Sequence, residues 1–153
     1  MRESDKRFWE QFKSDTGLKD AQFGSAWGFG TTTEMADELG QLVLMGKKTG
    51  TSSAVSLYEI DQEPFPTVGK VFDILLDGNE RPIAILQNIK VTPFRFEDVT
   101  AEMARKEGEG DLSIAYWQKV HRRFFKEEFQ KEGLIYDEAH LELIYEEFEV
   151  VYS

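Results

Sequence analysis

The chain has 153 residues, 41% of them apolar, and contains 12 Phe, 5 Tyr and 3 Trp but no Cys. This length predicts a single domain, residues 1–153, with a substantial core, and the lack of cysteine excludes disulfides, thiolate nucleophiles and cysteine zinc sites. The net charge of −11 opposes phosphate-led binding of a long nucleic acid, whereas a small nucleoside or a local basic groove would escape that repulsion.

The sequence carries no mark of secretion or of membrane insertion. Its first residues are mostly charged and no apolar signal region follows them. No apolar run approaches the roughly 18 residues of a membrane span. We therefore expect a cytoplasmic protein with no membrane partner. The only histidines are His121 and His140, so we expect no metal site and no cofactor, and nothing in the sequence specifies an oligomeric state.

A short amphipathic helix is predicted over residues 2–14, because its aromatic residues recur at helical spacing. Trp9 belongs to this aromatic stripe, so we expect it in the core rather than on a ligand. Residues 1–24 as a whole read as an N-terminal helical extension.

A connection rich in Gly and aromatic residues follows over residues 17–30. Trp27 and Phe29 lie in this connection, where they either line a pocket or pin the loop to the core. A second helix is predicted from a cap at Thr31 or a neighbour to Gly46, because glycine readily takes the left-handed turn after a last helical residue.

The middle of the chain predicts extended structure. Residues 49–60 should be extended, and residues 61–66 should end the segment because they contain two prolines. Residues 71–76 and 82–92 read as two strands joined by a strong turn signal at residues 77–80, which makes a β-hairpin.

The C-terminal half predicts helices over residues 96–106 and 114–131 and a final strand over residues 142–152. Strands that are separate from helices favour an α+β fold, here a small mixed barrel or a strongly curved sheet with helices on its rim. The longer helix also has a basic face, which is a solvated surface or a phosphate-contacting strip, formed by Lys119, Arg122, Arg123 and Lys126.

The stretch from Gly46 to Thr51 combines a helix end, a cation and hydroxyl groups. It is not a phosphate-binding P-loop, since Gln41 stands where that motif requires glycine. Two catalytic schemes fit the residues: Lys48 is neutral and activates Thr51, or an acid such as Glu107 is the base and charged Lys48 stabilises an oxyanion. The alternative is structural, because lysines favour a helix C-terminus and threonine favours a strand.

The chain contains the motif Gly46-x-Lys48-x-x-Thr51, which follows a Leu-rich helix and the Trp27-Gly-Phe-Gly30 loop. A second motif is the series Phe96-x-x-Val99, Ala104-x-x-Glu107-Gly-Glu-Gly-Asp111 and Trp117-x-x-x-His121-x-x-Phe124-Phe125. By these two motifs the chain, from about Ser25 to its end, resembles the ASCH domain family, in its longer bacterial branch.

This resemblance implies a PUA-like β-barrel with flanking helices and a cleft that binds RNA or a modified nucleoside. One small branch of the family hydrolyses the amide of N4-acetylcytidine with a Lys, a Thr and a Glu. Carried over by motif, these roles fall on Lys48, Thr51 and Glu107, with Glu109 as a competitor for the acid.

The expected ligand is thus a modified nucleoside or single-stranded RNA, and the expected activity is that of an amidohydrolase. Residues expected to contact the ligand besides the catalytic ones are Trp27, Phe29, Gly46, Lys47, Glu109 and Arg122. The alternatives are a non-catalytic RNA-binding module and a metal-independent ribonuclease.

Overall fold

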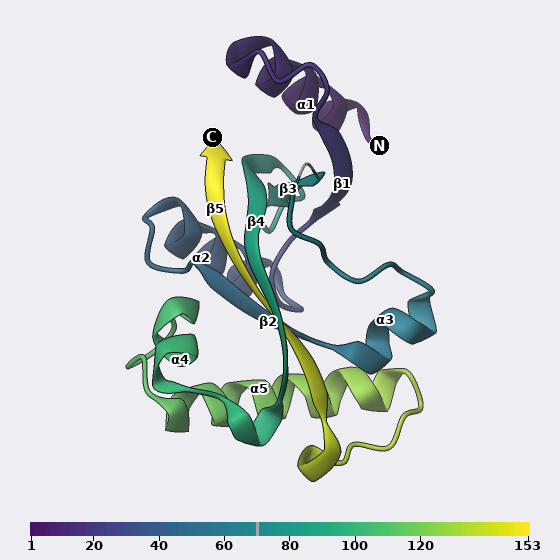
Figure 1. The fold of residues 1–153 in the computed structure, drawn as a ribbon, viewed down its shortest axis with the longest axis vertical. Helices are drawn as coiled ribbons and strands as arrows, with labels where there is room; N and C mark the ends of the chain where they lie inside the picture. Colours follow the sequence, from purple (N-terminus) through teal and green to yellow (C-terminus); the bar gives the residue numbers. More distant parts are fainter. Residues whose placement is uncertain (70) are drawn as a thin grey trace. The chain divides into compact units, whose positions relative to one another are not determined.

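The structure, a computed structural model, describes residues 1–69 and 71–153. The chain forms two compact units from interleaved segments (Figure 1). The first unit contains Met1–Lys47, Thr67–Lys90 and Phe148–Ser153, and the second contains Lys48–Pro66 and Val91–Glu147.

The described strands form one mixed sheet in the order β1-β3-β4-β5-β2. Strands β1 and β3 are parallel, whereas the β3–β4 and β2–β5 pairs are antiparallel. Among the residues that the structure describes, no pairing joins β1 to β2, so the sheet is open and the closed barrel that we predicted is not formed. The strand bounds are β1 Gln22–Trp27, β2 Gly50–Ala54, β3 Val71–Leu76, β4 Pro82–Arg95 and β5 Glu142–Tyr152.

In the first unit, α1 (Glu3–Thr16) and α2 (Thr33–Leu44) pack on strand residues that point to opposite faces. Trp9 of α1 is 5% exposed and lies in the core, as predicted. The cap of α2 is Thr32, whose side chain accepts a hydrogen bond from the Met35 amide. The predicted hairpin is confirmed as the antiparallel β3–β4 pair.

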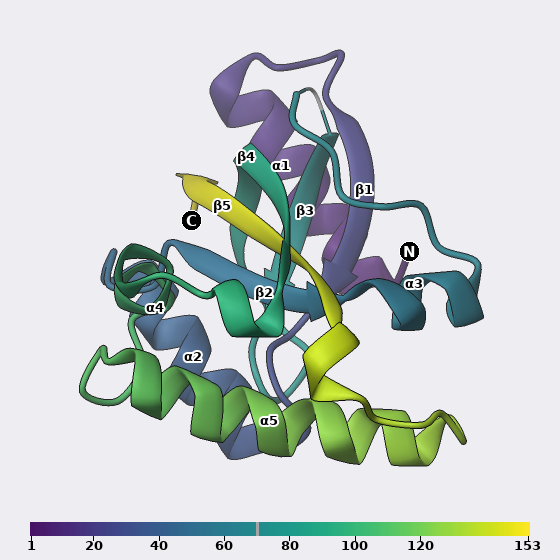
Figure 2. The same ribbon diagram turned by 60° about the horizontal axis from the view of Figure 1, so that its bottom comes forward.

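The second unit contains β2 and the helices that cover one of its faces. The helices of this unit are α3 Val55–Asp61, η1 Phe96–Asp98, α4 Ala101–Glu107, α5 Ile114–Lys131 and η2 Glu138–His140. Figure 2 shows α5 running along β2 and β5. Trp117 and Phe125 of α5 share one core cluster with Ala54 of β2 and Leu143 of β5.

Three local predictions are wrong in part. Residues 22–27 form strand β1 instead of a loop, because parallel pairing with β3 overrides a glycine-containing sequence with no regular alternation. Residues 55–61 turn into α3 instead of continuing the strand, which lets Leu57 reach the core. The predicted helix over residues 96–106 is split into η1 and α4, since Thr100 starts a new helix by accepting from the Met103 amide.

Of the helices described, none combines the length and apolar character that a bilayer crossing requires.

Candidate functional site

The site begins where the chain leaves α2. Gly46 has a φ of 76°, in the left-handed region, and its amide donates to the Val43 carbonyl, so the helix ends as predicted. Three residues later, the Thr49 amide donates to the carbonyl of Lys106 at 2.7 Å. This hydrogen bond ties the start of β2 to the end of α4, and it places Lys48 beside Glu107.

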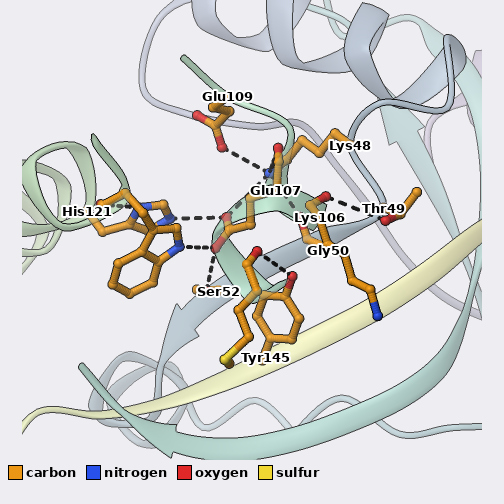
Figure 3. A network of polar contacts seen from close by, with 11 residues as sticks. Lys48, Thr49, Gly50, Ser52, Lys106, Glu107, Glu109, His121 and Tyr145 are labelled. Carbon is orange, nitrogen blue, oxygen red and sulfur yellow. Dashed lines mark hydrogen bonds and ion pairs between the residues drawn. The ribbon is translucent and has the colours of Figure 1, made fainter. Parts of the chain in front are cut away.

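Lys48 is 2% exposed, and its ammonium lies among four oxygen atoms (Figure 3). It donates to the Gly50 carbonyl at 3.0 Å and to the Glu107 carbonyl at 3.3 Å. Its Nζ also lies 3.4 Å from Oε1 of Glu107 and 3.0 Å from Oε2 of Glu109. Both acids proposed from the motif therefore reach the same lysine.

Glu107 is also 2% exposed, and each of its carboxylate oxygens accepts from two groups. Oε1 accepts from Lys48 and from Nε2 of His121 at 3.1 Å. Oε2 accepts from the Ser52 hydroxyl at 2.7 Å and from the indole N–H of Trp117. We call Lys48, Ser52, Glu107, Trp117 and His121 the Glu107 cluster (Figure 3).

These neighbours set the charge of the Glu107 carboxyl. Burial by itself raises the pKa of Glu107, but the charges of His121 and Lys48 and the hydrogen bonds from His121 and Trp117 lower it to about 2. Glu107 is therefore ionised at any physiological pH. A buried carboxylate is stable only when it is paired and hydrogen-bonded, and the cluster meets both conditions.

His121 carries the second positive charge of the cluster. Burial lowers its pKa, but the Glu107 carboxylate outweighs burial and the pKa is raised above its ordinary value of 6.5. The geometry agrees, since Nδ1 lies 2.8 Å from the Trp117 carbonyl, which can only accept. Nε2 faces an ionised carboxylate, which also only accepts. Both ring nitrogens of His121 therefore donate. The imidazolium stacks on the Trp117 ring, with 4.2 Å between the ring centroids.

Glu107, Glu109 and His121 could in principle supply metal ligands, since one donor atom from each lies within 4.8 Å of the others. The Lys48 ammonium, however, contacts both carboxylates. A metal ion would have to displace this lysine and take the proton from His121. The donor set therefore suits the ammonium better than a divalent cation.

Thr51 faces away from the Glu107 cluster. Successive residues of a strand point to opposite faces, and its neighbours Gly50 and Ser52 both face the cluster. Thr51 pairs with Glu146 across β2 and β5, and Ser53 on the same face lies 2.8 Å from the Tyr58 hydroxyl. The Tyr58 hydroxyl also lies 3.5 Å from Oε1 of Glu146. We call Thr51, Ser53, Tyr58 and Glu146 the Thr51 face.

The structure thus brings Lys48, Glu107 and Glu109 together but does not place Thr51 on their side of β2. Thr51 is partly buried rather than sealed in the core. Nε of Arg122 lies 2.6 Å from Oε1 of Glu138, and its guanidinium lies over the Phe96 ring. Contact of Arg122 with a ligand stays a prediction.

The other predicted ligand contacts belong to the first unit. Phe29 is 7% exposed and packs in that unit's core, and the Trp27 indole donates to Asp73 at 3.0 Å. Gly46 and Lys47 are exposed at the end of α2. Contact of these four residues with a ligand stays a prediction.

Several members of the two polar groups were missed from sequence. Trp117 and His121 were predicted only as positions of the second motif, and Ser52 was not predicted as a site residue. A usable signal existed for the first two, because residues four apart share a helix face. Tyr58 and Glu146 carried no comparable signal, since their contacts depend on α3 and on the β2–β5 register.

The chain has a mixed fold of helices and one open sheet. Its strand β2 is hydrogen-bonded through Ser52 to the buried carboxylate of Glu107. The sequence profile of the ASCH domain matches residues 25–152, so the chain belongs to the ASCH domain family. This is a PUA-like family that is associated with RNA binding.

Solved structures agree with this assignment. The chain is similar to an ASCH domain from Lactobacillus crispatus, at 31% identity and a TM-score of 0.91, over 100% of this chain and 97% of that one. It is also similar to a protein from Enterococcus faecalis, at 35% identity and a TM-score of 0.90, over 99% of this chain and 90% of that one. Among curated proteins, none matches this sequence significantly.

Proposed function

We propose that this protein hydrolyses the exocyclic amide of an acylated nucleoside, with N4-acetylcytidine as the substrate that the family resemblance implies. The proposal is supported by the hydrogen bonds that fix the strand on both sides of Thr51. Lys48 donates to the Gly50 carbonyl, and Glu107 accepts from the Ser52 hydroxyl. Gly50 and Ser52 are the two chain neighbours of Thr51. A nucleophile needs such a fixed position, because misplacement by about 1 Å can cost about 100-fold in rate.

In this proposal the Thr51 hydroxyl attacks the acyl carbon of the amide. The oxygen–carbon bond forms, the carbon–nitrogen bond breaks, and the amine of cytidine leaves with the proton that Thr51 gave up. Water then cleaves the threonine ester, which releases acetate and restores the hydroxyl. No electron donor or metal is needed for this sequence of steps.

Lys48 and Glu107 act in this scheme as positioning residues. The Lys48 ammonium lies among four protein oxygens, and an ammonium has no lone pair with which to take a proton from Thr51. A carboxylate with a pKa of about 2 is a weak base at neutral pH, and the oxygens of Glu107 already accept from four groups. Both residues therefore support the strand and do not themselves take the proton from Thr51.

The test is to incubate the purified protein with N4-acetylcytidine and to measure free cytidine. We expect release by the wild type and a loss of at least about 1,000-fold in Thr51→Ala, since removal of a covalent nucleophile abolishes the acyl transfer. Thr49→Ala is the matched control, because it removes a hydroxyl two residues away whose contact is with the Lys106 carbonyl. No release, or equal release by Thr51→Ala, overturns the proposal.

A second candidate is binding of an unpaired base without hydrolysis. It is favoured by the ring of Phe65, which is 48% exposed and lies edge-on to Tyr58 of the Thr51 face at 5.6 Å. Such a ring offers a surface on which an unpaired base can stack. Here Thr51 would donate a hydrogen bond to the base and would not attack it.

Binding of cytidine and of a short unstructured RNA, measured with increasing salt, tests this candidate. A flat response for both ligands indicates a nucleoside pocket, whereas affinity that falls steeply with salt indicates phosphate contacts. Binding that is unchanged by Phe65→Ala and Thr51→Ala would overturn the candidate.

A further inference from the structure

We propose that one face of helix α5 binds a single strand of RNA through its phosphates, as a surface separate from the Thr51 face. We call this surface the α5 basic face, and its members are Lys119, Arg122, Arg123 and Lys126. The inference does not depend on hydrolysis of an acylated nucleoside. It arises from a local concentration of cations in a chain whose net charge is −11.

The four cations share one side of the helix, because positions i, i+3, i+4 and i+7 lie on the same helix face. The buried residues of α5 lie on a different side, and they are Trp117, His121, Phe125 and Phe129. Lys119, Arg123 and Lys126 are exposed, and Arg122 is partly buried. At about 1.5 Å of rise per residue, the four cations extend over roughly 10 Å of the helix.

Acidic residues are absent from this stretch of sequence. Residues 112–126 contain the four cations and no Asp or Glu, so all 29 acids of the chain lie outside them. Glu127 does contact the α5 basic face, with Oε1 at 3.3 Å from Nε of Arg123. Their side chains are 50% and 84% exposed, and exposed pairs of this kind contribute little to stability. A phosphate can therefore replace Glu127 on Arg123.

Glu138 acts differently, because it balances the charge of Arg122. Nε and Nη2 of Arg122 donate to the two carboxylate oxygens at 2.6 and 3.0 Å, and the Tyr136 hydroxyl donates to Oε1 at 2.8 Å. The hydrogen bonds from Arg122 are the main cause that lowers the pKa of Glu138, so this carboxylate is ionised at neutral pH. We therefore assign the phosphate contacts of the wild type to the other three cations.

A row of cations matches an anion that repeats its charge along a chain, since a single phosphate can engage only part of the row. Lys126 also lies over the Tyr136 ring, with 5.6 Å from Nζ to the ring centroid. Cations beside aromatic rings are typical of surfaces that bind single-stranded nucleic acid. A flexible strand can follow the row and avoid the acids elsewhere on the protein, which a rigid duplex cannot do as easily. RNA is the strand we choose because the family is associated with RNA binding.

The experiment measures binding of a fluorescent oligouridine, which does not fold on itself, by anisotropy at a series of salt concentrations. The test variant removes three charges from the α5 basic face, by Lys119→Gln, Arg123→Gln and Lys126→Gln together. The matched control removes three charges from exposed positions of the first unit, by Lys6→Gln, Arg7→Gln and Lys19→Gln together. Both variants have the same net charge, so a difference between them is local. Urea unfolding verifies that each is folded.

For three phosphate contacts, the logarithm of the wild-type association constant should fall with the logarithm of salt concentration with a slope of about −2. The test variant should bind at least about 10-fold more weakly and lose most of this slope, while the control keeps it. Glu138→Gln should bind about 2- to 5-fold more tightly with a slope of about −3, because the charge of Arg122 is then no longer balanced. A merely structural role of Glu138 would not strengthen binding.

Equal affinity of the test variant and the control would overturn the inference and place the RNA elsewhere, for example on the Thr51 face. Binding that does not respond to salt would also overturn it. Binding of polyglutamate but not of oligouridine, lost in the test variant, would replace RNA by an acidic protein as the partner. An unchanged slope in Glu138→Gln would overturn the assignment to three cations. Cytidine release is not measured, so failure of the proposed function leaves this test intact.

Discussion

The ammonium of Lys48 lies 3.4 Å from the carboxylate of Glu107, although 59 residues separate them along the chain. Both side chains are buried, so the pair joins the strand after the first motif to the helix end of the second. The same two residues hold the chain neighbours of Thr51. The predictions below follow from this contact and from the face of β2 opposite to it.

Replacing Lys48 should lower the free energy of unfolding by more than the loss of its buried surface alone would. Lys48→Met leaves Glu107 and Glu109 without their shared cation, and breaking a buried pair on one side costs about 3–5 kcal/mol. Lys47→Met is the control, because that neighbouring lysine is exposed and should change stability by less than about 0.5 kcal/mol. Urea unfolding of both variants measures the difference. Equal stability of the two would show that the buried pair contributes nothing.

The Glu107–His121 pair should give stability a defined pH window. The pKa of Glu107 falls on folding from 4.5 to about 2, so its contribution is present above about pH 4.5 and is lost as the pH falls towards 2. The contribution of Glu107 to the free energy of unfolding is on the order of 3 kcal/mol. The pKa of His121 is raised above 6.5, so its contribution is complete below that pH and is lost as the pH rises through the folded pKa. Stability from the pair should therefore be greatest between about pH 4.5 and 6.5.

Unfolding by urea at a series of pH values checks this window. His121→Gln should lose the decline on the alkaline side and keep the decline on the acid side, because only the imidazole titrates near neutral pH. His140→Gln is the control and should keep the alkaline decline, since the exposed His140 pairs with Asp137 and not with the Glu107 cluster. An alkaline decline that survives in His121→Gln would assign it to another group.

Much of this architecture was accessible from sequence because local patterns and tertiary packing agree. The aromatic stripe of α1, the cap of α2 at Thr32 and the hairpin all have signals within a few residues. The meeting of Lys48 with Glu107 was accessible only through the family resemblance, since no periodicity relates two residues so far apart.

The failures have a common physical cause. Strand β1 and helix α3 are set by partners elsewhere in the chain, so local propensity gave the wrong state for both. The side of β2 on which Thr51 lies follows from strand alternation, but only after the strand's start and partner are known. A one-residue shift would have moved Thr51 to the cluster and Ser52 away from it.

The exposed ring beside the Thr51 face should contribute to binding rather than to chemistry. Phe65→Ala removes a half-exposed aromatic surface that touches Tyr58, and loss of a stacked base is worth about 1–3 kcal/mol. We therefore expect KM for N4-acetylcytidine to rise about 5- to 150-fold with kcat nearly unchanged. Phe65→Tyr should retain the wild-type KM. A fall in kcat at constant KM would argue against stacking on this ring.

Gly50 tests how tightly β2 is held on the cluster side. A Cβ added at this position would lie 2.2 Å from the Tyr145 hydroxyl and 2.7 Å from Cζ of its ring. That hydroxyl cannot simply swing away, because it donates to the Met103 carbonyl at 2.9 Å. Gly50→Ala must therefore move either the ring or the strand, at a cost of about 1–3 kcal/mol.

The same displacement should reach the chemistry, because the Gly50 carbonyl is one of the acceptors of Lys48 and precedes Thr51 directly. We expect Gly50→Ala to lower cytidine release more than its loss of stability explains at a temperature where the variant is fully folded. Gly133→Ala is the control, since its φ of 68° makes alanine costly by about 1 kcal/mol while nothing lies near its Cβ position. Urea unfolding and initial rates of both variants decide the matter. If the two glycine variants lose activity only in proportion to stability, the position of the Gly50 carbonyl does not matter to Thr51.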